Sequence, residues 1–245
     1  ETHFDWQSIF WFLTLYAFIT LFMVLFFIKE TQHKDTVQSI QPKQLIASYL
    51  HTIKHPIFLR LVVSQSLIFG GIFVYIAGSA SVLFDHLHLG PEDFWIQFVP
   101  MVGGMILGSI TAHRMTDKYS PLHMITASFT ITGLAAVSGL LSDFLFEPSV
   151  MSVIPFISVF AFGLSVGLPI LVTFALDCLP EKRGMATSLQ SFMQMGAAAL
   201  VAIFVVPLTH DSLKLMALSM LLMWLVGALL WVSVYSKVQK LEESR

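Results

Sequence analysis

Seven long apolar runs, separated by polar segments, account for most of the 245 residues. They are Ser8–Ile28, Ile57–Phe84, Phe94–His113, Leu122–Ser142, Val150–Leu176, Met185–Pro207 and Leu213–Ser236. A hydrocarbon core of about 30 Å requires about 20 apolar residues of helix to cross it, so each run is long enough to span a bilayer. None contains Asp or Glu, and the two basic residues within them, Arg60 and Lys214, lie near the ends of their runs. The pattern predicts an all-α integral membrane protein with seven transmembrane helices.

Charged residues are sorted between the two sides of these runs. The connections after the first, third and fifth runs and the end of the chain carry Lys29, Lys34, Lys43, Lys54, Arg114, Lys118, Lys182, Arg183, Lys237, Lys240 and Arg245. The opposite connections carry Asp85, Glu92, Asp93, Asp143, Glu147 and Asp211. Because connections rich in Lys and Arg stay in the cytoplasm, we expect the first residues outside and the C-terminus inside a cell (inner) membrane.

The connection between the first two runs is long, and its second half has helical periodicity. Within Lys43–His55, apolar residues recur at helical spacing with Lys and His between them, which is typical of an amphipathic helix on a membrane surface. We therefore expect a separate first helix over 1–28, a cytoplasmic linker with a surface helix over 29–56, a six-helix bundle over 57–236 and a cytoplasmic tail over 237–245.

Four short segments resemble one known family. The aromatic start of the first run is Phe4-Asp5-Trp6-Gln7-Ser8-Ile9-Phe10, and its end is Phe27-Ile28-Lys29-Glu30-Thr31. The third run holds Val99-Pro100, Gly103-Gly104 and Gly108 before Arg114, and the sixth begins Gly184-Met185-Ala186-Thr187-Ser188-Leu189-Gln190. These segments are similar to the major facilitator superfamily, and within it to drug:proton antiporters of the bicyclomycin and chloramphenicol resistance type, although the Pro that this type has before Glu30 is absent.

The resemblance implies that the seven runs are helices six to twelve, so that the last six form the C-terminal bundle of a major facilitator fold. It also implies part of a secondary active transporter that exports small lipophilic compounds, antibiotics included, by proton antiport through alternating access. The partners implied are the lipid bilayer, small-molecule drugs, protons and a missing N-terminal bundle of the same protein. The chain opens with Glu1 and not Met, which agrees with a missing upstream portion. A native seven-span protein is the alternative.

Polar and soft apolar residues on two runs are the candidates for substrate binding. Gln65, Phe69, Phe73 and Ile76 share one helical face of the second run, together with Ile72. Gln190, Met193 and Gln194 lie on the sixth run. An amide without a partner is costly in hydrocarbon, so these Gln side chains are expected to point into the bundle, where they either meet substrate or only hydrogen-bond neighbouring helices.

Charges at the basic ends of the runs are candidates for a cytoplasmic gate. They are Arg114 with Asp117 and Asp177 with Arg183, for which a solvated helix end is the alternative. The titratable group that proton antiport requires is not found midway along any run. The resemblance implies that it belongs to the N-terminal bundle.

Two runs contain pairs of glycines four residues apart. Gly104-x-x-x-Gly108 and Gly163-x-x-x-Gly167 predict close helix packing, either static or at a moving hinge near Pro169.

No phosphate-binding or dinucleotide motif, no C-x-x-C pair and no well-spaced metal ligands occur, so no enzyme activity, cofactor, metal or nucleic-acid partner is predicted. A retinal protein would need a Lys midway along the last run. A truncated remnant or receptor-like membrane protein without transport remains the rival interpretation.

Overall fold

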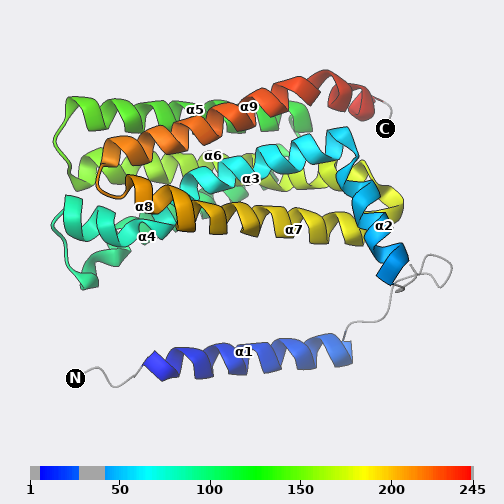
Figure 1. The fold of residues 1–245 in the computed structure, drawn as a ribbon, viewed down its shortest axis with the longest axis horizontal. Helices are drawn as coiled ribbons and strands as arrows, with labels where there is room; N and C mark the ends of the chain where they lie inside the picture. The colour runs from blue at the N-terminus through cyan, green and yellow to red at the C-terminus, as the bar shows by residue number, and fades with distance from the viewer. Residues whose placement is uncertain (1–5, 28–41, 244–245) are drawn as a thin grey trace. The chain divides into compact units, whose positions relative to one another are not determined.

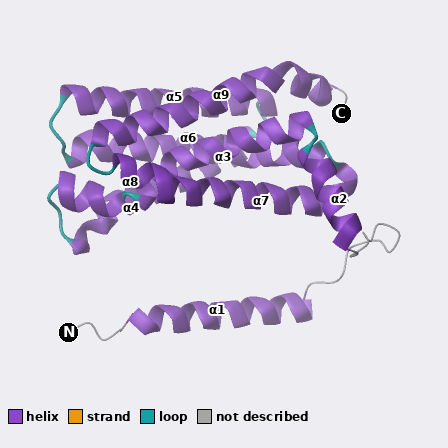
Figure 2. Cartoon of the chain, viewed as in Figure 1, coloured by secondary structure: helices purple, strands orange, loops and turns teal. Residues whose placement is uncertain are grey.

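The computed structural model describes residues 6–27 and 42–243, and the regular secondary structure of these ranges is entirely helical (Figure 1, Figure 2). The chain divides into two units, Glu1–Gln41 and Pro42–Arg245. The first unit contains α1 (Trp6–Phe27), which agrees with the first predicted run except that Ile28 lies outside the described residues. Most of the predicted linker, residues 29–41, also lies outside them, as do the last two residues of the tail.

The second unit consists of a surface helix and a bundle. Its helices are α2 (Pro42–Ile53), α3 (Pro56–Ala77), α4 (Phe94–Met115), α5 (Pro121–Leu145), α6 (Val150–Asp177), α7 (Arg183–Leu200), α8 (Val206–Thr209) and α9 (Leu213–Glu243). A π-helical segment, Val201–Val205, joins α7 to α8, so that Pro180–Thr209 forms one membrane-length helical stretch. With α1, the described residues contain seven helices long and apolar enough to cross a membrane. The predicted all-α membrane fold is confirmed.

One predicted run is divided in the structure. The run Ile57–Phe84 was expected to be a single helix, but α3 ends at Ala77 and a separate π-helical segment, Ser81–His86, follows it. Gly78 lies at the break, where its N–H bonds to the Val74 carbonyl at 2.9 Å. A Cβ on Gly78 would stand 2.7 Å from Met216 Cε, so glycine allows α9 to approach here. Hydrophobicity alone does not reveal such a break.

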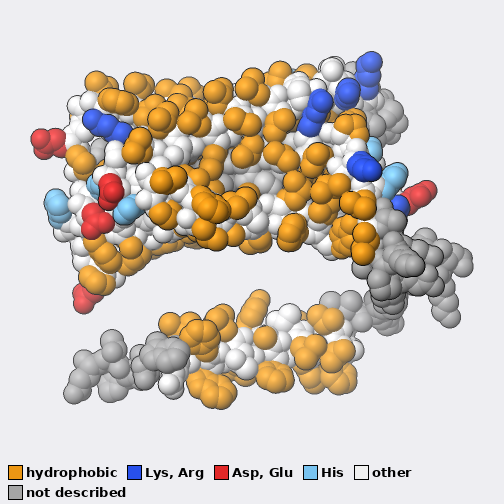
Figure 3. Space-filling view, in the orientation of Figure 1, with side chains coloured by type: hydrophobic (Ala, Val, Ile, Leu, Met, Phe, Trp, Pro, Cys, Tyr) orange, Lys and Arg blue, Asp and Glu red, His pale blue; other side chains and the backbone are white. Residues whose placement is uncertain are grey.

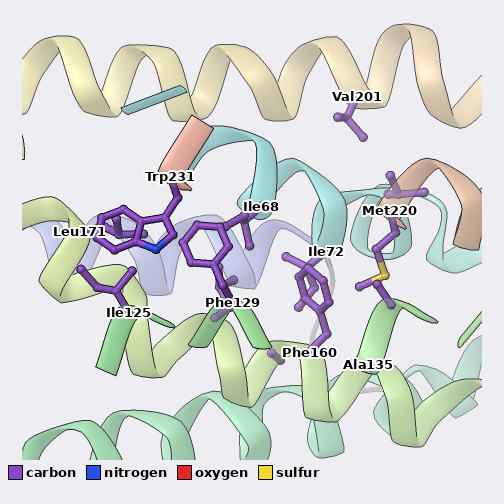
Figure 4. Packing of buried hydrophobic residues seen from close by; sticks show 14 of the residues in the cluster. Ile68, Ile72, Ile125, Phe129, Ala135, Phe160, Leu171, Val201, Met220 and Trp231 are labelled. Carbon is purple, nitrogen blue, oxygen red and sulfur yellow. The ribbon is translucent and has the colours of Figure 1, made fainter. Parts of the chain in front are cut away.

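The core of the bundle lies where α3, α5, α6 and α9 meet (Figure 4). Ile72 of α3, Phe160 of α6 and Met220 of α9 are completely buried. The ring of Trp231 stacks on that of Phe129, with centroids 5.9 Å apart and planes 8° from parallel. The spans of α3, α5 and α6 are the most buried of those described, whereas α4 and α7 keep much of their apolar surface exposed.

The predicted glycine pairs lie at close helix crossings. A Cβ on Gly104 of α4 would stand 3.2 Å from the Ser158 carbonyl carbon of α6, and Gly108 faces the Phe162 backbone in the same way. Gly163 and Gly167 of α6 face α5, where Ser128 Oγ donates to the Gly163 carbonyl at 2.5 Å. At all four positions a side chain larger than hydrogen would collide with the neighbouring helix, which agrees with the close packing predicted from the sequence.

A helix, α2, occupies the segment that was predicted to form the surface helix. Thr52 is completely buried, and its hydroxyl lies 3.7 Å from the sulfur of Met185 on α7. Ile46 and Leu50 remain more than half exposed. Thr52 therefore lies on the face of α2 that contacts the bundle, while two apolar residues of the helix remain exposed.

Charged side chains lie mainly at the ends of the bundle. Figure 3 shows hydrophobic side chains along its length and Lys, Arg, Asp, Glu and His side chains gathered toward the two ends. The end that contains the α4–α5 and α6–α7 connections carries most of the basic residues. This distribution fits a protein whose central belt lies in hydrocarbon.

Candidate functional site

Three glutamines from two helices form a chain of amides inside the bundle. Gln190 Nε2 of α7 donates to Gln65 Oε1 of α3 at 2.9 Å, and Gln65 Nε2 donates to Gln194 Oε1 of α7 at 3.0 Å. Gln65 is 1% exposed and Gln190 5% exposed, whereas Gln194 is half-buried. Residues 190 and 194 are one helical turn apart, so both reach the same side chain on α3. The structure thus brings together all three predicted amides.

The amide chain leaves one acceptor unused. Gln190 Oε1 is buried and has no hydrogen-bond partner among the described residues. A buried acceptor without a partner costs about 1–3 kcal/mol. A ligand or water that donates a hydrogen bond to this oxygen would remove that cost. The chain of amides therefore joins α3 to α7 and leaves one buried acceptor unpaired.

Soft apolar side chains flank the amides. Phe69 and Phe73 lie one and two turns beyond Gln65 on α3, with ring centroids 5.9 Å apart. Both rings are half-buried, as are Ile76 and Met193, and all four pack against the core. Ile72, which was expected to share this face, is instead completely buried in the core. The predicted apolar residues thus lie at the edge of the bundle core, on the same two helices as the amides.

Only one of the two predicted gate pairs forms in the structure. Arg183 Nη2 of α7 lies 2.5 Å from Asp177 Oδ1 at the end of α6. Arg114 and Asp117 are exposed, and within the described residues no salt bridge joins them. The Arg183 side chain is 60% exposed, and exposed ion pairs contribute at most about 1 kcal/mol. The Asp177–Arg183 pair joins the two ends of the α6–α7 connection, and its contribution to the stability of the fold is small.

Two buried polar residues were missed by the sequence interpretation. Gln97 of α4 is completely buried and donates from Nε2 to the Tyr75 carbonyl of α3 at 2.8 Å, while its Oε1 has no partner among the described residues. The Tyr75 hydroxyl is also buried without a partner there. The sequence did contain a signal for this contact. Gln97 is an amide within the third apolar run, and a glutamine in hydrocarbon requires a hydrogen-bond partner.

The end of the bundle opposite the basic end has a polar pocket of about 560 Å³ whose lining includes His86, Asp143, Asp211 and Lys214. Asp143 was expected in a loop, but α5 continues to Leu145 and includes it. His86 Nε2 lies 2.7 Å from the His210 carbonyl. Within the described residues, no group of three or more His, Cys, Asp or Glu could hold a metal ion.

Comparison with known proteins gives one family. The family model described as Major Facilitator Superfamily matches residues 2–202. The chain is also similar to the bicyclomycin resistance protein homolog of Haemophilus influenzae, with 22% identity over 220 residues, which are 89% of this chain and 54% of that protein. The chain thus spans about half the length of the curated relative that it matches.

Proposed function

This chain belongs to the Major Facilitator Superfamily, whose members are transporters and not enzymes, and we propose that it is part of a secondary active transporter that exports small lipophilic compounds. The export is driven by proton antiport, and the complete transporter, with two bundles, alternates between inward-open and outward-open states. The observation that carries the proposal is the amide chain Gln65–Gln190–Gln194 beside Phe69, Phe73 and Met193. A few polar groups among adaptable apolar side chains suit varied lipophilic molecules.

Exposed apolar surface on α4 and α7 supports a second bundle as partner. Trp95 and Val99 of α4 are each 61% exposed, and Phe192 of α7 is 74% exposed. Lipid covers some of this surface in any membrane protein. We infer that an N-terminal bundle of the same protein covers the rest and completes the cavity, with the chain in the inner membrane and its C-terminus in the cytoplasm.

The coupling group is proposed to lie in that second bundle. Within the described spans, Asp and Glu occur only near the helix ends, as Asp143 and Asp177 do. A group that couples proton movement to transport must be reached alternately from both sides of the membrane. The middle of these six helices offers Gln, Ser and Thr for substrate contact but no carboxylate.

The test measures drug efflux from energised vesicles. The 245-residue chain alone is expected to give no proton-linked efflux, because one bundle supplies only one wall of the cavity. Co-expressed with an upstream segment of the same gene, it should give efflux that an uncoupler abolishes. Uncoupler-sensitive efflux by the isolated chain would contradict the proposal. Absence of efflux in both preparations would favour a membrane protein without transport.

The same assay tests the amide site. In the efflux-competent pair, Gln194→Leu should change which drugs are exported while protein abundance stays constant. If the amides serve only to join helices, the substitution should lower abundance and efflux of all drugs together, with a stability loss of about 0.6–2 kcal/mol. Thr130→Ala is the control, because Thr130 is exposed on α5, a helix that carries none of the three amides, and its hydroxyl bonds only to its own helix.

A further inference from the structure

A groove of about 700 Å³ runs between α5 and α9. In Figure 1 these two helices lie along one edge of the bundle, and α4 and α7 lie along the other. The lining of the groove includes the indole rings of Trp224 and Trp231 and the hydroxyl groups of Tyr235 and Ser236. No Asp or Glu lines it within the part of the chain that the structure describes. A second bundle against α4 and α7 would leave this groove facing the bilayer.

The groove is polar at one end and apolar at the other. Tyr235 and Ser236 lie near the end of α9, and Thr126 lies near the start of α5, so these hydroxyl groups belong to the basic end of the bundle. From Ser236 to Trp224 the groove follows about 18 Å of helix. One leaflet of a hydrocarbon core is about 15 Å thick. The groove therefore has the length of a single acyl chain, with its polar end at the level of the lipid headgroups.

The aromatic wall of the groove is held in place by the fold. Trp224 Nε1 donates to the Phe129 carbonyl at 3.0 Å and lies 3.1 Å from Thr132 Oγ1. Gly133 leaves room for this indole, because a Cβ there would stand 2.7 Å from Trp224 Cε2. Trp231 is fixed in turn by its stacking on Phe129. The two indoles thus form a wall that exists before any ligand binds.

An arginine without a counterion lies beside the polar end of the groove. Arg60, in the second turn of α3, is exposed, and its Nη1 donates to Ser233 Oγ of α9 at 3.4 Å. Among the described residues no carboxylate forms a salt bridge with it. Ser233 and Ser236 are three residues apart and are therefore neighbours on the surface of α9. A guanidinium at this level of the membrane is suited to a phosphate, which it can bind through two N–H groups.

Further basic side chains surround the same end. Lys237 and Lys240 follow Ser236 on α9, and both are exposed. His123 is also exposed and precedes Thr126 by three residues, which places it on the groove side of α5. Figure 3 shows Lys and Arg side chains gathered near the end of α9. Clusters of this kind beside a membrane-spanning helix attract anionic lipids.

We propose that the groove between α5 and α9 binds an anionic phospholipid, whose phosphate contacts Arg60 and Ser236 and whose acyl chain lies against Trp224 and Trp231. The acyl chain of a zwitterionic lipid fits the same wall, but the positive group of its headgroup is repelled by the basic end. Charge therefore decides which lipid is preferred. The site goes beyond the proposed function, because a lipid held on the outside of the bundle is neither exported nor a carrier of protons.

The test measures quenching of tryptophan fluorescence by lipids with brominated acyl chains. Trp6, Trp11 and Trp95 are replaced by Phe, so that Trp224 and Trp231 are the tryptophans that remain. The chain is reconstituted in phosphatidylcholine vesicles. Brominated phosphatidylglycerol is expected to quench at a lower mole fraction than brominated phosphatidylcholine, and high salt should reduce the difference. Equal quenching by the two lipids at low salt would overturn the proposal.

Variants of single charges separate a site from general attraction. Arg60→Gln should lower the preference for phosphatidylglycerol about 5-fold, the factor that one basic residue near a membrane surface contributes. Arg60→Lys, which keeps the charge, should retain most of the preference. Lys182→Gln removes one positive charge from the α6–α7 connection at the same end and should leave the preference unchanged.

An equal loss in Lys182→Gln and Arg60→Gln would show attraction to the whole basic end and would overturn the site. Circular dichroism should give the same helicity for all variants, because Arg60 and Lys182 are not part of the core. The measurement does not involve drug efflux. Its failure would therefore leave the proposed function standing, and failure of efflux would leave the lipid site standing.

Discussion

At the scale of single residues, His55 makes the stability of the first bundle helix, α3, depend on pH. It is the N-cap of α3, where its Nδ1 accepts a hydrogen bond from the Phe58 N–H at 3.3 Å. Burial, and then the nearby His51, lower the pKa of His55 below its ordinary value. Only the neutral ring has the free nitrogen that this cap requires.

We expect acid to weaken the cap. A histidine with a lowered pKa in the fold binds fewer protons than in the unfolded chain, so its contribution to stability is complete above about pH 6.5 and decreases as the pH falls below that value. Thermal unfolding measured across this range should show a decrease in the parent chain that is smaller in His55→Asn, because Asn caps a helix without titrating. An identical pH dependence in the two proteins would exclude His55 as its source.

The glutamines show what can be predicted at this scale. The sequence predicted that Gln65, Gln190 and Gln194 point inward, because an amide cannot remain unpaired in hydrocarbon. The sequence left open whether the three glutamines pair with each other. The spacing of residues along α7 does not determine how α3 is rotated about its own axis. The unpartnered Gln190 Oε1 and the buried Gln97–Tyr75 contact depend on that rotation and were not predictable.

At the scale of helices, the contact between α4 and α6 depends on single glycines. Gly104 faces the α6 backbone at Ser158, whereas a Cβ on its neighbour Gly103 would meet nothing within 4 Å. Gly104→Ala should therefore force the helices apart and lower stability by about 1–3 kcal/mol. Gly103→Ala, the matched control, should be neutral or stabilising by up to about 1 kcal/mol, because alanine favours a helix. Unfolding in detergent measures both, and equal effects would show that the close approach at Gly104 does not contribute to the stability of the bundle.

Helix ends were predicted less well than helix existence. The apolar runs identified all seven spans, but they did not reveal the end of α3 at Ala77 or the π-helical segment Val201–Val205. Both features lie inside continuous apolar sequence. At the end of α3, glycine allows the close approach of Met216 of α9 to Gly78, a contact with a residue far away in the sequence that the hydrophobic pattern does not contain.

At the scale of the whole molecule, the sorting of charge predicts the orientation. In a chain whose native Cys178 is replaced by Ser, single cysteines at Glu92 and Glu147 should react with an impermeant thiol reagent in intact cells. Single cysteines at Lys34 and Lys118 should react only after the cells are opened, because their connections are the basic ones. Labelling of Lys118→Cys from outside would reverse the orientation and invalidate the proposed helix numbering.

The two hydrogen bonds of the amide chain that joins α3 to α7 run in the same direction, and this direction can be reversed. As observed, each amide donates toward Gln194, which leaves an oxygen at the Gln190 end and an N–H₂ group at the Gln194 end. Rotation of all three amides by half a turn would keep both interhelical bonds and exchange the two free groups. The same three side chains can thus meet a hydrogen-bond donor or an acceptor at either end without any movement of the backbone. Chemical tolerance toward unlike molecules would then arise from a switch in polarity, not from a flexible pocket.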